Sequence, residues 1–288
     1  MLEGTVLLTG ASGLLGTWLR RTAPTESSIV CVQHRTPLKG VVEVSADLCD
    51  REAVRAVIAS VRPTVVIHAA YSKSHQAIVT ATRHLAEASH EFGAHHVYIS
   101  SDAVFSGENK PQRENDVPDP IWDYGHWKAE AERITASKGS GTIIRLPLIV
   151  SVDPADHVVH SITAAAALGR QTKWFVDEFR QPASASELAE ACWRIASLDA
   201  HQNHGVWHLP GPESLSRFDI ADRVVSAMGL DPSTIERTKT PRGAKRPRSL
   251  HLTDDRARTS IAWDPSAVLP ERQIEVEAWN AANAHFAP

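Results

Sequence analysis

Cysteine is scarce in this chain: three residues, Cys31, Cys49 and Cys192, are scattered among 288 positions without paired spacing. An odd, scattered set excludes a disulfide framework and gives no support to a cysteine-based zinc site. Long apolar runs are missing too, since no stretch approaches the roughly 20 residues that a membrane span needs. Nothing near the N-terminus resembles a signal peptide. We therefore expect a cytoplasmic protein without a membrane partner.

An excess of basic charge is also absent, because the net charge is -4 and the isoelectric point is near 6.4. Binding to nucleic acid rests on surplus lysine and arginine, so no nucleic-acid partner is expected. One basic run, residues 242–248, stands alone and suits a single anionic ligand or a solvated loop. The 15 histidines complete no metal motif, since Ala94 stands where His-Glu-x-x-His would need its second histidine. The sequence predicts no metal.

Short apolar runs alternate with helical patterns through the first half of the chain. Strands are expected at residues 5–8, 29–32, 41–44, 65–67, 97–99 and 142–146. Helices are expected near residues 14–19, 50–61, 75–92 and 124–137, and Asp50 stands at an N-cap position. Continuous apolar strands separated by helices indicate a doubly wound α/β fold of the Rossmann type, with a parallel sheet covered on both faces.

The second half is less regular, with helical patterns near residues 158–168, 186–198, 218–228 and 274–286 and one strand at 205–209. Short mixed elements of this kind suit a smaller substrate lobe. We predict a dinucleotide-binding domain over residues 1–150, to which residues 182–210 return. The substrate-binding lobe is then partly interleaved with it and consists of residues 151–181 and 211–288.

A glycine-rich turn follows the first strand and precedes the first helix. In such a turn Gly10 permits the tight bend, Gly13 lets the backbone approach a pyrophosphate, and Gly16 allows close packing of helix and strand. The helix N-terminus directs free N–H groups and a positive dipole end at the phosphates. The strand before and the helix after meet the context that the motif requires. The segment therefore predicts a dinucleotide site, which also includes Ser12, Leu14 and Leu15.

The second strand ends at His34 and Arg35, and no carboxylate stands there. An acidic residue about 20 residues past the glycines would bind a ribose 2′-hydroxyl and favour NAD(H). Arg35, together with His34, could instead pair with a 2′-phosphate. The sequence therefore favours NADP(H) over NAD(H), and the alternative is a solvated arginine in a loop.

Of only three tyrosines, Tyr124 alone has a lysine four residues later, Lys128, one helical turn away. Reduction of a carbonyl needs a hydroxyl that gives its proton to the carbonyl oxygen, and a nearby ammonium makes the phenolate accessible. Ser101, at the end of the fifth strand, can polarise the same carbonyl. Tyr-x-x-x-Lys alone would usually mark a surface helix. With the glycine turn and Ser101 in this order, it predicts a reductase.

The glycine spacing and the order of Ser101, Tyr124 and Lys128 resemble the short-chain dehydrogenase/reductase superfamily. Within it, four segments resemble the dTDP-4-dehydrorhamnose reductase family, and the likeness runs over most of the chain: residues 99–107, 114–125, 177–189 and 246–252. The resemblance implies reduction by NADPH of the 4-keto group of a nucleotide-linked 6-deoxysugar. A homodimer is the candidate assembly.

The resemblance also implies further site residues. At the cofactor, beside Tyr124 and Lys128, it implies Asp47, Leu48, Ala69, Ala70 and Tyr71. At the substrate it implies Asp102, Val104 and Phe105, and for the diphosphate the candidates Arg145, Arg180, Arg246 and Arg248. Among the eight tryptophans, Trp122, Trp127 and Trp174 lie in segments near the site and could stack on a sugar, although most tryptophans are packing residues.

Three positions depart from the family pattern. Ile78 stands where an asparagine is common, Ala103 replaces a tyrosine, and Trp127 replaces the serine before the lysine. A related branch, the regulatory β subunit of methionine adenosyltransferase, shares the Ser-Ser-Asp stretch and the late Arg-Pro segment. It implies an alternative, an NADP-binding regulatory or scaffold protein without turnover. The intact pair of Tyr124 and Lys128 favours the enzyme.

Overall fold

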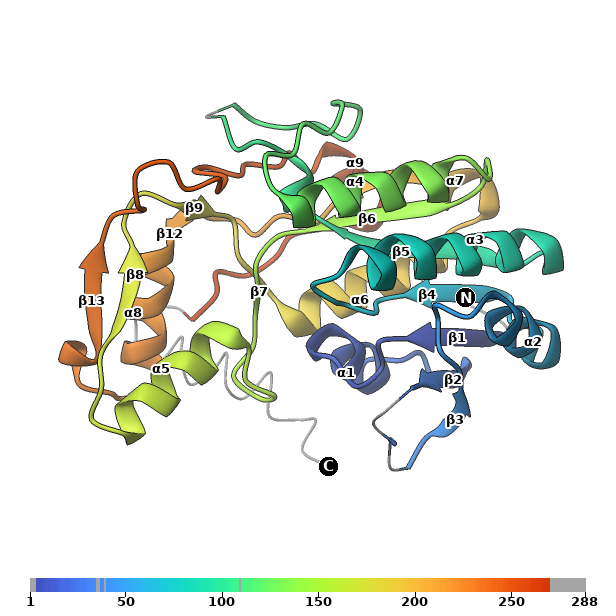
Figure 1. Cartoon of the computed structure of the whole chain (residues 1–288), viewed down its shortest axis with the longest axis horizontal. Helices are drawn as coiled ribbons and strands as arrows, with labels where there is room; N and C mark the ends of the chain where they lie inside the picture. The colour runs from blue at the N-terminus through green and yellow to red at the C-terminus, as the bar shows by residue number, and fades with distance from the viewer. Residues whose placement is uncertain (1–3, 35–36, 39, 109, 270–288) are drawn as a thin grey trace.

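A parallel sheet of seven strands forms the larger half of the computed structural model, which describes residues 4–34, 37–38, 40–108 and 110–269 (Figure 1). The strand order is β11-β6-β5-β4-β1-β2-β3. The strands are β1 (Thr5–Thr9), β2 (Ser28–Gln33), β3 (Val42–Ser45), β4 (Val65–His68), β5 (His95–Ser101), β6 (Thr142–Leu146) and β11 (Gly205–His208). The order reverses between β1 and β4, the switch point where such sheets bind ligands. The predicted doubly wound α/β class is confirmed.

Helices cover both faces of the sheet (Figure 1). On one face lie α1 (Leu14–Arg21) and α6 (Ala185–Ala196), and on the other lie α2 (Arg51–Val61), α3 (Ala81–Phe92) and α4 (Asp123–Ala136). Asp50 caps α2 as predicted, because its side chain accepts the N–H groups of Glu52 and Ala53. Buried indoles find polar partners: Trp18 donates to Ser151 Oγ at 3.0 Å, and Trp193 donates to the Leu19 carbonyl at 3.0 Å.

The smaller half lies beside the carboxyl ends of the strands (Figure 1). It contains α5 (His157–Ala167), α8 (Arg217–Ala227) and the parallel pair β8 (Thr172–Phe175) and β13 (Ile235–Thr238), with its own apolar core. Short elements complete this region and the sheet's edge: β7 (Ile149–Val150), β9 (Phe179–Arg180), β10 (Ala183–Ser184), β12 (Leu215–Ser216), α7 (Ala200–Asn203), η3 (Pro232–Thr234) and α9 (Asp255–Ile261). The helix predicted near residues 274–286 lies outside the described residues.

The helix predicted over residues 75–92 is divided in the structure. A π-helical turn, η1 (Gln76–Thr80), precedes α3, and the hydroxyl of Thr82 donates to the Ile78 carbonyl at 2.6 Å. Wide turns of this kind often occur at functional sites. The turn buries the Ile78 side chain against Tyr98 and Trp127. Apolar periodicity does not distinguish such a turn from a regular helix. Among the described residues, no helix combines the length and the apolar character needed to cross a membrane.

A buried ion pair fixes α4 to the sheet. Glu132, on α4, receives two hydrogen bonds from Arg145 on β6, at 3.0 and 2.8 Å, and a third from the hydroxyl of Ser100 on β5 at 2.5 Å. Arg145 also contacts a ring nitrogen of His208 on β11 at 3.1 Å. Both partners are at most 5% exposed, so the pair is closed off from water. Three strands therefore share one anchor for this helix.

We expect Glu132→Leu to reduce the free energy of unfolding by about 3–5 kcal/mol, because the Arg145 charge stays buried without its partner. Urea denaturation of the purified protein measures this change. Glu132→Gln keeps one acceptor oxygen for Arg145 and Ser100, so it should cost less than Glu132→Leu. Glu91→Gln breaks an exposed pair with Arg55 and should change stability little. Equal losses in Glu132→Leu and Glu91→Gln would contradict the assignment of Glu132 as the anchor.

Candidate active site

The glycine turn packs directly against the end of β4. Gly10 has a φ of +71°, and a Cβ there would lie 2.5 Å from the backbone of Ala69 and Ala70. A Cβ on Gly16 would lie 2.1 Å from the Gly10 carbonyl oxygen. Neither position can hold a side chain, as the motif predicts. Gly13 is the N-cap of α1 and supplies no side-chain cap, so the first N–H groups of this helix are open to an anion.

A cleft runs along the carboxyl edge of the sheet in two joined parts. One part, about 620 Å³, is lined by predicted cofactor residues that include His34, Asp47 and Leu48. The other, about 400 Å³, is lined by Gly13, Leu14, Leu15, Gly16 and Ala69, together with Ser101, Tyr124 and Lys128. Gly10, Ser12, Ala70 and Tyr71 border both parts. The structure therefore brings the predicted cofactor residues to one cleft, except Arg35, which lies outside the described residues.

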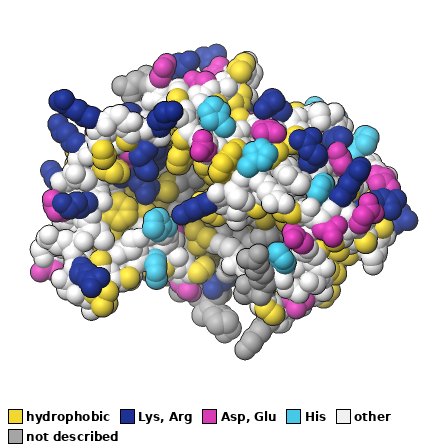
Figure 2. Space-filling model, viewed as in Figure 1, with side chains coloured by type: hydrophobic (Ala, Val, Ile, Leu, Met, Phe, Trp, Pro, Cys, Tyr) yellow, Lys and Arg dark blue, Asp and Glu magenta, His cyan; other side chains and the backbone are white. Residues whose placement is uncertain are grey.

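The surface is hollowed between the two halves of the molecule. Figure 2 shows hydrophobic side chains deep in this hollow and lysine and arginine side chains around it. The carboxyl ends of β1, β4 and β5 face the hollow (Figure 1). A ligand bound there would meet an apolar floor and a basic rim. Among the described residues, no group of histidine, cysteine, aspartate or glutamate is arranged to hold a metal ion.

Lys128 is buried in the second turn of α4, with 4% of its surface exposed. Its Nζ donates to the Ile99 carbonyl at 2.8 Å and lies 4.7 Å from the centre of the Tyr98 ring and 5.9 Å from that of Tyr124. Burial lowers the pKa of Lys128 to about 8, and the charge of Glu132 opposes this shift. A lysine in a cleft whose pKa is shifted toward neutral pH is typical of a functional site.

Tyr124 lies at the start of α4, where it faces the same cleft. Burial raises its pKa, the nearby Tyr71 and Asp102 act in the same direction, and a hydrogen bond with Ser101 opposes them. The Ser101 hydroxyl also donates to Asp102 Oδ1 at 3.0 Å and accepts the N–H of Ala103 at 3.2 Å. Ser101, Tyr124 and Lys128 thus converge at the end of β5. A phenol whose pKa is raised stays protonated and can act as a general acid.

Three of the residues predicted at the substrate are core residues instead. Arg145 is enclosed in the buried pair with Glu132 and cannot reach a diphosphate. The structure therefore corrects the prediction that it contacts one. Val104 and Phe105 are 0% and 1% exposed and pack against two leucines of the late Arg-Pro segment, at 250 and 252. Their side chains lie in the core next to the site and do not line the cleft. Asp102 is 6% exposed; burial raises its pKa, and the charges of Arg180 and Arg217 oppose that shift.

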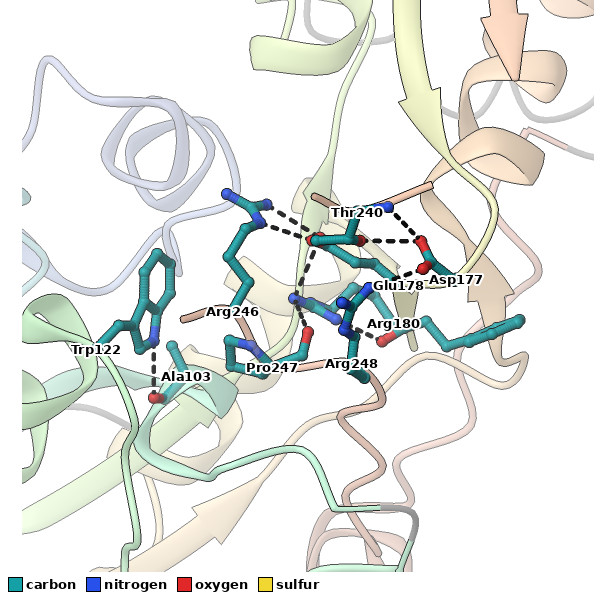
Figure 3. Close-up of polar contacts among 10 residues, drawn as sticks. Ala103, Trp122, Asp177, Glu178, Arg180, Thr240, Arg246, Pro247 and Arg248 are labelled. Carbon is teal, nitrogen blue, oxygen red and sulfur yellow. Dashed lines mark hydrogen bonds and ion pairs between the residues drawn. The ribbon is translucent and has the colours of Figure 1, made fainter. Parts of the chain in front are cut away.

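The other arginines predicted to contact the diphosphate lie close to the carboxylates of Asp177 and Glu178, which directly precede β9 (Figure 3). Arg246 donates to both oxygens of Glu178, at 2.6 and 3.0 Å, and Arg180 lies 3.8 Å from the same carboxylate. Arg248 pairs with Asp177 at 2.7 Å. Glu178 is fully buried, whereas the Arg246 side chain is 40% exposed. The structure thus brings Arg180 and Arg246 together and directs Arg248 to a separate partner.

Sequence reasoning missed Arg217, which lies at the start of α8 beside this cluster. Burial lowers its pKa to about 10; the charges of Arg180 and Arg246 act in the same direction, and Glu178 opposes them. Its guanidinium lies 5.7 Å from the Trp174 ring centre and forms no side-chain hydrogen bond with the described part of the chain. A cation is unfavourable at the positive end of a helix. The helix start marked by Ser216 could have drawn attention to it.

The fold and the site define a Rossmann-type dinucleotide-binding protein with the serine, tyrosine and lysine of a short-chain dehydrogenase/reductase. Residues 4–268 match the family model described as the RmlD substrate binding domain, and the chain belongs to this family. The resemblance to dTDP-4-dehydrorhamnose reductases and to the methionine adenosyltransferase β subunit is confirmed.

Individual relatives span most of the chain. It is similar to methionine adenosyltransferase 2 subunit beta of Bos taurus, with 29% identity over 88% of this chain and 81% of that protein. The dTDP-4-dehydrorhamnose reductase of Streptomyces griseus is 28% identical over 96% of this chain and 90% of its own length. The crystal structure of a hypothetical dTDP-4-dehydrorhamnose reductase from Sulfolobus tokodaii has a TM-score of 0.80 and 28% identity, covering 92% of this chain and 98% of that one.

We expect Lys128→Met to stabilise the cofactor-free protein at pH 7, because it removes a buried charge that the site keeps at some cost in stability. The folded pKa of about 8 lies below the ordinary value of 10.5. Between these two pH values the unfolded chain binds more protons, so the free energy of unfolding of the wild type rises with pH. In Lys128→Met this rise should flatten.

Urea denaturation at a series of pH values from 7 to the alkaline limit of solubility measures both effects. Lys138→Met, in the turn after α4, is the matched control and should follow the wild type because Lys138 is only partly buried. A Lys128→Met protein that is less stable at pH 7, or that keeps the wild-type slope, would refute the buried cation.

Proposed function

We propose that the protein reduces a keto group with NADP(H), and that its substrate is the 4-keto group of a nucleotide-linked 6-deoxysugar. The observation that carries this proposal is the convergence of Ser101, Tyr124 and Lys128 on the cleft that the glycine turn borders. The protein is an NAD(P)-dependent oxidoreductase of the short-chain dehydrogenase/reductase type. Its cytoplasmic location and its homodimer stay predictions.

The glycine turn fits a dinucleotide. The space that a Cβ would fill at Gly10 and Gly16 is taken by backbone, and the uncapped N-terminus of α1 offers N–H groups to a pyrophosphate. Asp47 and Leu48 would border the adenine, and Ala69, Ala70 and Tyr71 the ribose. Lys128 would hold the nicotinamide ribose. When bound, NADPH supplies the hydride.

Tyr124 acts as the general acid in this proposal. Its raised pKa keeps the phenol protonated until a carbonyl oxygen gains negative charge, and the Lys128 ammonium then favours the phenolate that remains. Ser101 would turn its hydroxyl from Asp102 to the substrate oxygen, where a donor stabilises developing charge. Catalysis therefore requires the substrate to compete with Asp102 for one proton.

The arginine cluster supports a diphosphate-bearing substrate. Arg180, Arg217 and Arg246 gather near Glu178, and among these three only Arg246 donates hydrogen bonds to its carboxylate. Guanidinium groups bind phosphate oxygens well because their N–H groups match the geometry of the anion. These residues lie within 151–181 and 211–288, the segments that we assign to the substrate lobe. Arg248 stays a weaker candidate because Asp177 already pairs with it.

A second function has its own support. The relative from Bos taurus carries the name of a methionine adenosyltransferase subunit, and Ile78 and Trp127, which depart from the reductase pattern, belong to the apolar cluster around Tyr98. The alternative is an NADP-binding regulatory or scaffold protein without turnover. The complete set of Ser101, Tyr124 and Lys128 favours the enzyme, because a scaffold has no need for a buried lysine.

We expect Tyr124→Phe to lower kcat for NADPH oxidation by about 10²–10⁴-fold, because the proton donor is lost while the ring stays. The assay follows NADPH absorbance with a panel of nucleotide-linked 4-keto-6-deoxysugars. NADPH affinity, measured by fluorescence titration, should be similar in both proteins. Equal rates would rule out Tyr124 as the acid. Tight NADPH binding without turnover of any ketone by the wild type would favour the regulatory alternative.

The cofactor preference has a separate test. Arg35→Ala should weaken NADPH binding by about tenfold or more, since a charge-assisted contact with the 2′-phosphate is lost. NADH lacks that phosphate, so its affinity should change little. Titration of both cofactors against wild type and variant gives the ratio. Equal losses for NADPH and NADH would refute the contact.

A further inference from the structure

A hydrogen-bonded chain of three buried side chains links β1 and β4 to α3. Thr9 ends β1, His68 ends β4, and Thr82 lies in the first turn of α3; each is at most 1% exposed. The Thr9 hydroxyl lies 2.8 Å from Nδ1 of His68, and Nε2 of His68 lies 3.1 Å from the hydroxyl of Thr82. We call these three residues the His68 chain.

The His68 chain has one direction, which its last member sets. The Thr82 hydroxyl donates its hydrogen to the Ile78 carbonyl at 2.6 Å, so toward His68 it can only accept. Burial holds the pKa of His68 well below its usual value, so the ring is neutral and offers one donor and one acceptor. Nε2 of His68 therefore donates to Thr82, and Nδ1 accepts from the Thr9 hydroxyl.

The chain ends on η1, the π-helical turn to which Ile78 belongs. In this turn the N–H of Ala81 bonds to the carbonyl of Gln76, five residues back, instead of four as in a regular helix. Turns of this kind are rare and occur mostly at functional sites. Because Thr82 accepts from His68 and donates to Ile78, it fastens the π-turn to the sheet.

The two ends of the His68 chain lead to different walls of the cofactor cleft. Thr9 directly precedes Gly10, which borders both parts of the cleft. At the other end, Gln76 and Ala77 of the π-turn line the larger part, of about 620 Å³. The chain is therefore a connection through side chains between the glycine turn and the π-turn.

The segment 47–49, which follows β3, rests on the same part of the molecule. The thiol of Cys49 donates to the Gln76 carbonyl at 3.7 Å, and Nδ1 of His84 on α3 lies 3.1 Å from the Leu48 carbonyl oxygen. All three residues of the segment line the larger part of the cleft. Whatever holds the π-turn and α3 in place therefore also holds this segment.

We propose that His68 is a positioning residue for the cofactor: it holds the π-turn, and with it the segment 47–49, in a fixed place relative to the glycine turn. This inference rests on the proposed cofactor cleft and adds a residue that lines neither part of it. A dinucleotide that fills the cleft would contact both walls, and a wall that is already in place loses less freedom on binding. His68 should therefore govern cofactor affinity and leave proton transfer at Tyr124 unchanged.

The test measures the Kd of NADPH by fluorescence titration in Thr9→Val and Thr82→Val, each of which removes one hydroxyl and keeps a branched side chain. We expect each change to raise Kd by about 3–10-fold, the equivalent of one hydrogen bond. Either change breaks the chain, so the double variant should bind at most about twofold more weakly than the weaker-binding single variant, whereas the effects of independent sites would multiply. His68→Leu removes both links and should match the double variant.

Thr135→Val is the matched control, since Thr135 on α4 is equally buried and its hydroxyl has no hydrogen-bond partner within the described residues. It should bind NADPH as the wild type does. His68→Gln can accept through its amide oxygen and donate through its amide nitrogen, so it should keep part of the affinity that His68→Leu loses. The losses in the chain variants should be similar for NADPH and NADH, because the chain acts on the wall and not on the 2′-phosphate. Urea denaturation verifies that each variant is folded.

Two further readouts separate positioning from a general loss of stability. In Thr9→Val the amides of Ile78 and Ala81, on another element, should exchange hydrogen about 3–10-fold faster, because the π-turn has lost its link to β1. At saturating NADPH, kcat should stay within about twofold of the wild type while KM for NADPH rises. Unchanged NADPH affinity in the chain variants, or losses that multiply in the double variant, would overturn the proposal.

A failure of the proposed function gives a different result. A wild type that binds NADPH but reduces no ketone still tests the His68 chain, because affinity does not require turnover. If the wild type binds neither NADPH nor NADH, hydrogen exchange tests the chain alone. Faster exchange at Ile78 and Ala81 in Thr9→Val, absent in Thr135→Val, would support the link between the two turns although the cofactor cleft had failed. Unchanged exchange would overturn the link itself.

Discussion

The buried pair of Glu132 and Arg145 determines where α4 lies against the sheet. Residues 124, 128 and 132 are spaced by four along α4 and therefore share one face of the helix. Once Glu132 is held by Arg145 and Ser100, the two preceding turns must present Lys128 and Tyr124 to the end of β5. The pair also uses both carboxylate oxygens of Glu132. Lys128 is consequently left with the Ile99 carbonyl and the Tyr98 ring, which leaves its charge poorly compensated.

Local patterns were sufficient to predict the architecture and the nucleotide cleft. The strand at 142–146 and the cap at Asp50 agree with the structure, because continuous apolar runs and Asx caps depend on neighbours in sequence. The glycine turn agrees as well, since its contacts are set by backbone. The π-turn at 76–80 and the two-residue strands were not predictable, because tertiary contacts decide them and their composition matches that of helix or loop.

The charged residues show where sequence reasoning stops. Arg145 and Arg180 look alike in sequence, yet one is enclosed by Glu132 and the other lies near Asp102 and Glu178. The two arginines differ in the partner that each meets. Such partners can lie far apart in the chain, as Glu178 and Arg246 do at a separation of 68 residues, so the sequence does not reveal them. The same holds for Val104 and Phe105, which the late Arg-Pro segment covers. A motif predicts which residue types are present, whereas burial decides which of them can reach a ligand.

Several polar groups of the site are already hydrogen-bonded to one another before any substrate binds. Ser101 donates a hydrogen bond to Asp102, Arg246 donates two to Glu178, and the Trp122 indole donates to the Ala103 carbonyl. A substrate gains binding energy only where it replaces such a bond with an equal one or covers apolar surface. Anionic oxygens can replace Glu178 at the arginines, and a carbonyl can replace Asp102 at Ser101.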